Sequence, residues 1–151
     1  MHILIVASLA AAIFKGSLTT KHDEFAVTLQ SHSPDILAIN ETWLKAGEEA
    51  RAPNIQGYKL IHLPRPTEVS SRGGGVGFYV KRGFRVRKCA HPSGLAEVEQ
   101  MWISLSINLH NILIGTAYRP PWLDIDKFFD ALTDRAGLEK FDGLHKLLRT
   151  L

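Results

Sequence analysis

Apolar residues fall into short runs along the chain, and polar segments that contain glycine or proline separate these runs. Short apolar runs bounded by turn-forming residues are typical of β-strands. The pattern predicts seven strands, which lie within residues 1–14, 35–40, 58–63, 76–80, 81–88, 99–107 and 112–118.

The strands differ in the burial that their patterns predict. Residues 36–39 are apolar without interruption, so strand 35–40 is expected to be covered on both faces. Residues 99–107 alternate instead, which predicts a half-buried strand with its apolar side chains on one face. A short polar segment at 108–111 follows, so residues 112–118 are expected to return as the partner strand of a hairpin.

A first helix is predicted over residues 21–32. Phe25 and the leucine four positions later share one face of this segment. Thr20 and Asp23 fit a capping box at its start, and Ser33, which precedes a proline, is expected to end it.

A second helix is expected to begin after Asp124, whose side chain can cap it. Its apolar residues recur at helical spacing, at Ile125, Phe128, Phe129 and Leu132. The final segment 143–151 also has leucines at three- and four-residue steps, so its period is that of a helix, although a strand remains an alternative.

The order of these elements defines the fold class. A helix between two apolar strands makes residues 1–40 a candidate βαβ-like unit. The later strands are joined by short connections, which predicts a mixed or largely antiparallel sheet. We therefore expect an α/β fold, and a length of 151 residues suits one domain.

Composition narrows the class of protein only slightly. With 45% hydrophobic and 22% charged residues, the chain can form a globular core. A net charge of +3 is compatible with a polyanionic partner but does not identify one. The single cysteine, Cys89, excludes an intrachain disulfide and a cysteine metal cluster, and suits a reducing compartment. The seven histidines show no ligand spacing on a helix, which argues against a zinc site.

The apolar N-terminus allows two interpretations. Residues 1–14 have about the length of a signal-peptide core and are too short to span a bilayer. Because no lysine or arginine precedes this run, we favour a buried strand over a signal peptide. The protein is then expected in the nucleus or the cytoplasm, with no membrane partner.

Glu41 stands at the end of the uninterrupted apolar strand. In one interpretation it simply ends the strand and points to water, and in the other a rigid sheet holds an acid in place for chemistry. Hydrolysis of a phosphodiester needs a hard cation held by carboxylates, a group that orients the phosphate, and a base for the water. Glu41 could supply the first and Tyr118 part of the second, while no residue evidently supplies the base.

Three consecutive glycines at 73–75 lead into strand 76–80. They suit either a tight turn before the strand or a close approach of the backbone to an active site. No lysine followed by serine or threonine stands at P-loop spacing, and a strand follows instead of a helix, so nucleotide-binding fingerprints do not apply.

Basic residues gather in segment 81–88, where Arg85 and Arg87 would share one strand face. This strand is either a charged edge that resists aggregation or a surface that contacts nucleic-acid phosphates. Further along, two prolines follow Tyr118 and Arg119 and are expected to hold both in place. The candidate nucleic-acid-binding residues are Arg72, Arg85, Arg87 and Arg119.

Four motifs together resemble a known family. PDILAINETWL, RGGGVGFYV, EVEQMWISL and LIGTAYRPP follow one another over residues 34–121. In this order they resemble the endonuclease domain of non-LTR (LINE-type) retrotransposons, which belongs to the endonuclease/exonuclease/phosphatase superfamily. The resemblance implies a four-layer α-β-β-α sandwich and a Mg²⁺-dependent hydrolase that nicks DNA to prime reverse transcription. It also implies two catalytic residues, namely Glu41 as the metal ligand and Tyr118 beside the scissile phosphate. The implied partners are DNA and the reverse transcriptase domain of the same element.

Two parts of the family's pattern are unmatched. The family has an asparagine at the end of its first strand, where this sequence has Phe14 or, in a shifted frame, Ala10. The family also continues into Gly-Asp-Phe-Asn and Ser-Asp-His motifs, which carry most of the catalytic groups, and the sequence ends before them. We therefore expect residues 1–151 to be the N-terminal part of one such domain, with its sandwich incomplete at the C-terminus.

Whether this chain is an enzyme is left open by the sequence. Because catalytic groups of this kind act as a unit, we expect no measurable cleavage of DNA by the chain itself. Two alternatives remain beside a truncated endonuclease domain. One is a non-catalytic remnant that binds nucleic acid, and the other is a further phosphodiesterase or phosphatase branch of the same superfamily.

Overall fold

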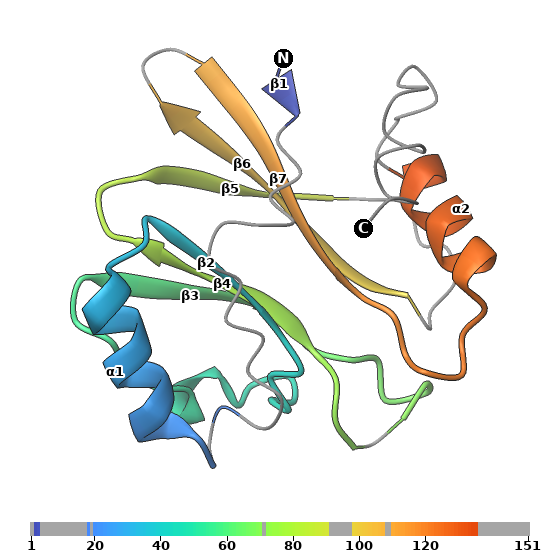
Figure 1. Ribbon diagram of the computed structural model, residues 1–151, viewed down its shortest axis with the longest axis horizontal. Coiled ribbons are helices and arrows are strands. Elements are labelled where there is room, and N and C mark those ends of the chain that lie inside the picture. The colour runs from blue at the N-terminus through green and yellow to red at the C-terminus, as the bar shows by residue number, and fades with distance from the viewer. Residues whose placement is uncertain are drawn as a thin grey trace. The chain divides into compact units, whose positions relative to one another are not determined.

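The computed structural model in Figure 1 describes residues 2–3, 18, 20–70, 72–90, 98–107 and 110–135. The chain divides into two compact units. The first comprises Met1–Cys89 together with Glu99–Tyr118, and the second comprises Ala90–Val98 together with Arg119–Leu151.

The first unit contains two sheets and one helix. In chain order its elements are β1 (His2–Ile3), α1 (His22–His32), β2 (Ile36–Asn40), the 3-10 turn η1 (Glu49–Arg51), β3 (Tyr58–Leu63), β4 (Val76–Lys81), β5 (Arg85–Cys89), β6 (Glu99–Ile107) and β7 (His110–Tyr118). One sheet has the order β1-β7-β6-β5 and the other β2-β4-β3. All neighbouring strands pair antiparallel except β1 and β7, which are parallel. The predicted α/β class with mixed pairing is therefore confirmed.

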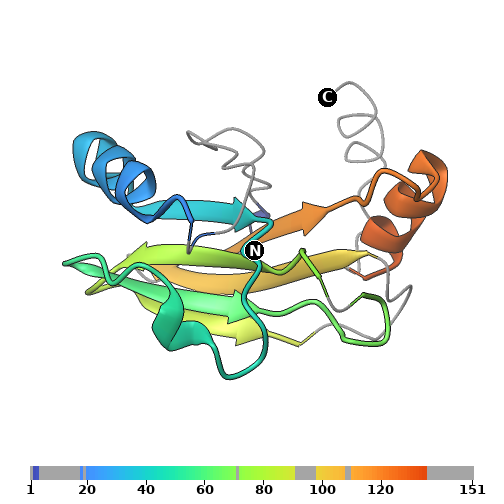
Figure 2. The same ribbon diagram turned by 90° about the horizontal axis from the view of Figure 1, so that it is seen from below.

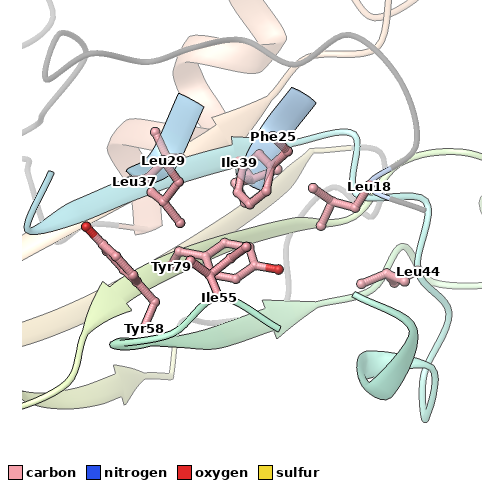
Figure 3. Packing of buried hydrophobic residues seen from close by; sticks show 9 residues of the cluster. All are labelled: Leu18, Phe25, Leu29, Leu37, Ile39, Leu44, Ile55, Tyr58 and Tyr79. Atoms are coloured by element: carbon pink, nitrogen blue, oxygen red, sulfur yellow. The ribbon is translucent and has the colours of Figure 1, made fainter. Parts of the chain in front are cut away.

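Helix α1 packs on the outer face of the β2-β4-β3 sheet. Figure 3 shows Phe25 and Leu29 of α1 facing Leu37 and Ile39 of β2, with Tyr79 of β4 beneath them. The rings of Phe25 and Tyr79 have their centroids 4.9 Å apart. The same cluster also contains Leu18, Leu44, Ile55 and Tyr58. The predicted apolar face of the first helix thus meets the sheet as expected.

A second core lies between the two sheets. Its buried residues come from β4, β6 and β7 and are Val76, Phe78, Val80, Met101, Ile103, Leu105 and Ile114. Ile36 and Ala38 of β2 pack against this core, while Leu37 and Ile39 belong to the core under α1. Strand β2 is therefore covered on both faces, as its uninterrupted apolar run predicts. Helix α1 and the two sheets form the α-β-β part of the expected sandwich (Figure 2).

The ends of α1 confirm one predicted signal and contradict the other. Ser33 ends the helix in the left-handed conformation, with φ 43°, and its N–H donates to the carbonyl of Leu29. The predicted capping box is wrong, because the N-cap residue is Lys21 and no side chain caps the helix there. The helix begins one residue later than a box starting at Thr20 requires.

The βαβ-like interpretation of residues 1–40 is also wrong. Strand β1 pairs with β7 in one sheet, whereas β2 pairs with β4 in the other. Helix α1 therefore connects two sheets and does not cross over within one. Of the first predicted strand only His2–Ile3 is described, and the helical pattern at 143–151 lies outside the described residues.

The second unit contains α2 (Ile125–Arg135). The Asp124 carboxylate accepts hydrogen bonds from the N–H groups of Asp126 and Lys127 at 3.0 and 3.1 Å, which confirms the predicted cap. Phe128 and Ala131 of this helix pack with Val98 and Leu123, forming a small core of its own. Neither described helix has both the length and the apolar character that crossing a membrane requires.

Candidate active site

A strained turn presents Glu41 directly after the end of β2. Glu41 and Trp43 both have positive φ, at 64° and 60°, which is uncommon for residues other than glycine. Two backbone hydrogen bonds fix the turn against the glycine run, from Thr42 N–H to the carbonyl of Gly75 and from Trp43 N–H to that of Gly74. Such conformations cost about 1–3 kcal/mol each and cluster at functional sites. The backbone here marks a candidate site independently of any motif.

The carboxylate of Glu41 is held by three donors. Its Oε2 accepts a hydrogen bond from Trp43 Nε1 at 2.8 Å and another from the Gly74 N–H at 3.0 Å. The Tyr118 hydroxyl, at the end of β7, forms a hydrogen bond with the same side chain. The structure thus brings together the two residues proposed as catalytic, although they are far apart in the sequence and follow or end strands of different sheets, β2 and β7. Their catalytic roles stay a prediction.

These contacts change the pKa values of both side chains. Partial burial alone would raise the pKa of Glu41. The hydrogen bonds from Tyr118, Gly74 and Trp43, with the charge of Arg65, outweigh burial and lower it below 4.5. Desolvation, together with the hydrogen bond to Glu41 and its charge, raises the pKa of Tyr118 to about 12. At pH 7 Glu41 is therefore an anion and Tyr118 a neutral donor.

This linkage predicts an acid transition that the fluorescence of Trp43 reports. Because the pKa of Glu41 is lowered in the folded state, its ionised contacts are present above pH 4.5 and are lost as pH falls through the lowered value. The emission of Trp43 is the difference between the emission of wild type and that of Trp43→Phe at each pH. We expect this difference to change with a midpoint below pH 4.5. Glu41→Gln should abolish that change, and far-UV circular dichroism should show that it precedes unfolding. A midpoint above 4.5 would contradict the lowered pKa.

The glycine run is part of the site and does more than lead into β4. Gly74 and Gly75 have φ of 75° and 83°, and their N–H groups donate to Glu41 and Glu99 respectively. A side chain at Gly75 would collide with the Thr42 hydroxyl, and one at Gly74 with Arg65. Of the two interpretations offered by the sequence, the close approach of backbone to the site is the one that the geometry supports.

Arg65 and Glu99 belong to the same site, although neither was predicted from the sequence. Their side chains form a largely buried ion pair, and the other Glu99 oxygen accepts the Gly75 N–H at 2.7 Å. The guanidinium of Arg65 also lies over the ring of Tyr118, with 5.9 Å between its central carbon and the ring centroid. The available signal was Glu99 itself, a charged residue on the same strand face as the apolar Met101 and Ile103.

Polar residues behind the turn support it from the interior. Asn40 binds Thr116 and the carbonyl of Ala117, and so ties the end of β2 to β7. Thr42 is fully buried, with its hydroxyl 2.8 Å from His62 Nε2. Desolvation lowers the pKa of His62 despite the charge of Glu49, so this ring is neutral at pH 7. These contacts fix the backbone from which Glu41 projects.

The four arginines expected to bind nucleic acid have different surroundings. Arg72 stacks on the Trp43 ring, with 5.6 Å between its guanidinium carbon and the ring centroid, and so lies at the site. Arg85 and Arg87 are exposed on the edge strand β5, beside a groove of about 610 Å³. Arg119 belongs to the second unit, where it donates to the carbonyl of Leu123. Nucleic-acid binding by any of them stays a prediction.

The contacts of the Glu41 carboxylate leave room for a divalent cation. A carboxylate offers about four acceptor positions, and three are used here, so one position remains for a cation. Mg²⁺ is commonly bound by one or two carboxylates, with waters and substrate phosphates as its other ligands. Among the described residues, no group of three or more His, Cys, Asp or Glu side chains could hold a metal ion. The site therefore suits a cation shared with a phosphate and does not suit a closed protein cage.

Comparison with solved structures finds the same fold. The endonuclease domain of TRAS1, a telomere-specific non-LTR retrotransposon, matches with a TM-score of 0.55 and 14% identity, over 84% of this chain and 52% of that one. A humanized D. rerio TDP2 matches with a TM-score of 0.54 and 12% identity, over 83% of this chain and 50% of that one. The chain thus spans about half the length of each. At these identities the likeness shows the fold alone.

Sequence comparison provides the family. No curated protein sequence matches this chain. A family model described as the endonuclease/exonuclease/phosphatase family matches residues 15–138. The matched region includes the turn at Glu41, the glycine run and Tyr118. The chain therefore belongs to the endonuclease/exonuclease/phosphatase family.

Proposed function

We propose that this chain carries part of the active site of a retrotransposon-type endonuclease, which hydrolyses a DNA phosphodiester with the help of Mg²⁺. The observation that carries the proposal is the Glu41 carboxylate, ionised and fixed on a strained turn beside the hydroxyl of Tyr118. The order of the four sequence motifs supports this branch of the family, and the fold shared with the TRAS1 domain is compatible with it.

Four residues of the site have a definable part in such a reaction. Glu41 would hold the cation, whose chemistry is to stabilise the negative charge that develops on the phosphate oxygens. The Tyr118 hydroxyl, protonated because its pKa is about 12, can donate a hydrogen bond to a phosphate oxygen. Gly74 and Trp43 keep the carboxylate oriented through their N–H groups.

A base for the attacking water is not evident among the described residues around Glu41. Glu99 is engaged by Arg65 and by the Gly75 N–H, and the high pKa of Tyr118 keeps it protonated. General base catalysis needs a group that accepts a proton near the working pH. We therefore propose that residues 1–151 alone orient a cation and a phosphate but leave supercoiled plasmid DNA uncut in Mg²⁺.

Tb³⁺ luminescence tests the cation site without relying on activity. Tb³⁺ prefers oxygen ligands and emits when a nearby indole is excited, and the Trp43 nitrogen lies 2.8 Å from Glu41 Oε2. We expect saturable emission that Mg²⁺ displaces and that Glu41→Gln abolishes. Glu48→Gln is the matched control, because Glu48 is a carboxylate with a lowered pKa that pairs with Arg51 away from this turn.

One outcome would overturn the proposed cation site, and another would overturn only the expected inactivity of the chain. Tb³⁺ emission in Glu41→Gln equal to that of wild type would show that the cation binds elsewhere. Plasmid nicking in Mg²⁺ that disappears in Glu41→Gln would show that the chain cleaves DNA by itself, and would refute its expected inactivity.

A further inference from the structure

Trp43 is exposed and yet held rigidly. The residue is 40% exposed, although its backbone N–H donates to the carbonyl of Gly74 and its indole N–H to the carboxylate of Glu41. The backbone itself has a φ of 60°, which disfavours a bulky side chain. A large aromatic ring kept in a strained position at the surface, with its N–H group used inside the site, offers a flat face to a ligand.

A pocket of about 370 Å³ adjoins this ring. Its lining includes Trp43, Lys45, Pro64, Arg65, Pro66 and Ser70. The volume lies within the range of pockets that bind small organic groups. One aromatic ring and two prolines line it, together with the cations of Lys45 and Arg65 and the carboxylate of Glu68. The ring and the prolines suit a flat heterocycle, and Lys45 can contact a phosphate attached to it.

Gly73 connects this pocket to the carboxylate of Glu41. It lines the pocket, and a Cβ placed on it would lie 3.6 Å from both Glu41 Oε2 and Trp43 Nε1. The pocket and the candidate cation site are therefore separated by little more than a glycine backbone. A ligand group in the pocket and a phosphate at Glu41 can belong to one polymer.

Positive charge accompanies the ring. The guanidinium of Arg72 stacks on Trp43 without being part of the pocket lining, and Lys45 lines the pocket. Nucleic-acid sites that bind single strands combine aromatic rings, on which bases stack, with cations that follow the phosphates. A stacked base would account for the exposed ring, and phosphate contacts would account for the two cations.

We propose that the pocket beside Trp43 binds an unpaired nucleotide of the DNA strand, next to the phosphate that lies at Glu41. The base stacks on the indole, while Arg72 and Lys45 contact the adjoining phosphates. The indole then has two separate uses, because its N–H orients Glu41 and its ring face binds the base. This inference rests on the proposed function, since it takes DNA as the polymer that reaches Glu41.

The experiment compares two short single strands of DNA, one of thymidines and one of the same length with abasic residues throughout. Both carry the same phosphates, so the ratio of their affinities reports the bases alone. Fluorescence anisotropy in EDTA and low salt measures binding without a cation. Wild type is expected to prefer the thymidine strand about tenfold. Trp43→Ala should remove this preference, whereas Trp43→Phe, which keeps a ring, should retain most of it.

Control variants separate this subsite from other surfaces. Trp122 is also exposed, at 65%, and belongs to the second unit, so Trp122→Ala should keep the wild-type ratio. The inference is overturned if Trp43→Ala keeps the tenfold preference, or if Arg85→Ala with Arg87→Ala removes the preference and Trp43→Ala does not.

The two proposals fail independently of each other. Tb³⁺ bound through Glu41 without any base preference at Trp43 would refute only the nucleotide subsite. A base preference that depends on Trp43, with Tb³⁺ emission unchanged in Glu41→Gln, would refute only the proposed cation site.

Discussion

Arg65→Ala is expected to lower the free energy of unfolding by about 3–5 kcal/mol, because it leaves the buried carboxylate of Glu99 without its cation. The exposed fractions of the two side chains are only 7% and 3%. The Gly75 N–H that remains on Glu99 is a single neutral donor and cannot replace the guanidinium. Urea unfolding followed by far-UV circular dichroism would measure the loss.

The double variant Arg65→Ala with Glu99→Ala distinguishes the loss of the ion pair from the cost of a buried, unpaired carboxylate. Removing both partners leaves no buried charge, so part of the stability is expected to return relative to Arg65→Ala alone. The cost of Glu99→Ala should be measured in wild type and again in Arg65→Ala. If both costs are equal, the two side chains do not act as a unit.

Phe25→Ala is expected to cost about 3–5 kcal/mol of unfolding free energy, since its ring is fully buried between α1 and the β2-β4-β3 sheet. The ring contacts Tyr79 of β4, with centroids 4.9 Å apart (Figure 3). Its removal opens a cavity that the sheet, paired on both sides of β4, cannot close easily.

Val27→Ala is the matched control on the same helix. Val27 is 66% exposed, and alanine favours the helix more than valine does, so this variant should unfold within about 0.5 kcal/mol of wild type. Equal losses in Phe25→Ala and Val27→Ala would show that α1 does not pack through the face described here.

Local patterns in the sequence predicted most of the fold. The uninterrupted run at 36–39 predicted a strand covered on both faces, as the structure shows. The alternation of 99–107 correctly predicted one apolar face toward the second core, but the strand is not half-buried throughout, because Gln100 and Trp102 on the opposite face are buried as well. These predictions succeeded because each depends on side-chain period within one element. The βαβ-like unit failed because sheet membership depends on which distant strand is the partner, and period alone carries no information about it.

The sequence indicated two residues of the candidate site but not the ion pair beside them. Glu41 and Tyr118 were predicted because they stand in two of the sequence motifs, and the structure places them in contact, while their catalytic roles stay a prediction. Arg65 lies in a proline-containing loop and Glu99 begins a strand, so neither has a local pattern that indicates their pairing. Trp43 was visible in the sequence, but the left-handed turn that directs it was not.

The glycine run bonds through successive N–H groups to Glu41, which follows β2, and to Glu99, which begins β6. These two strands belong to different layers of the sandwich, and Asn40 adds a further link from β2 to β7. Any sliding of one layer over the other must therefore disturb the acid at Glu41 at once. Loosening of the contact between the sheets is therefore expected to displace the Glu41 carboxylate before either sheet unfolds.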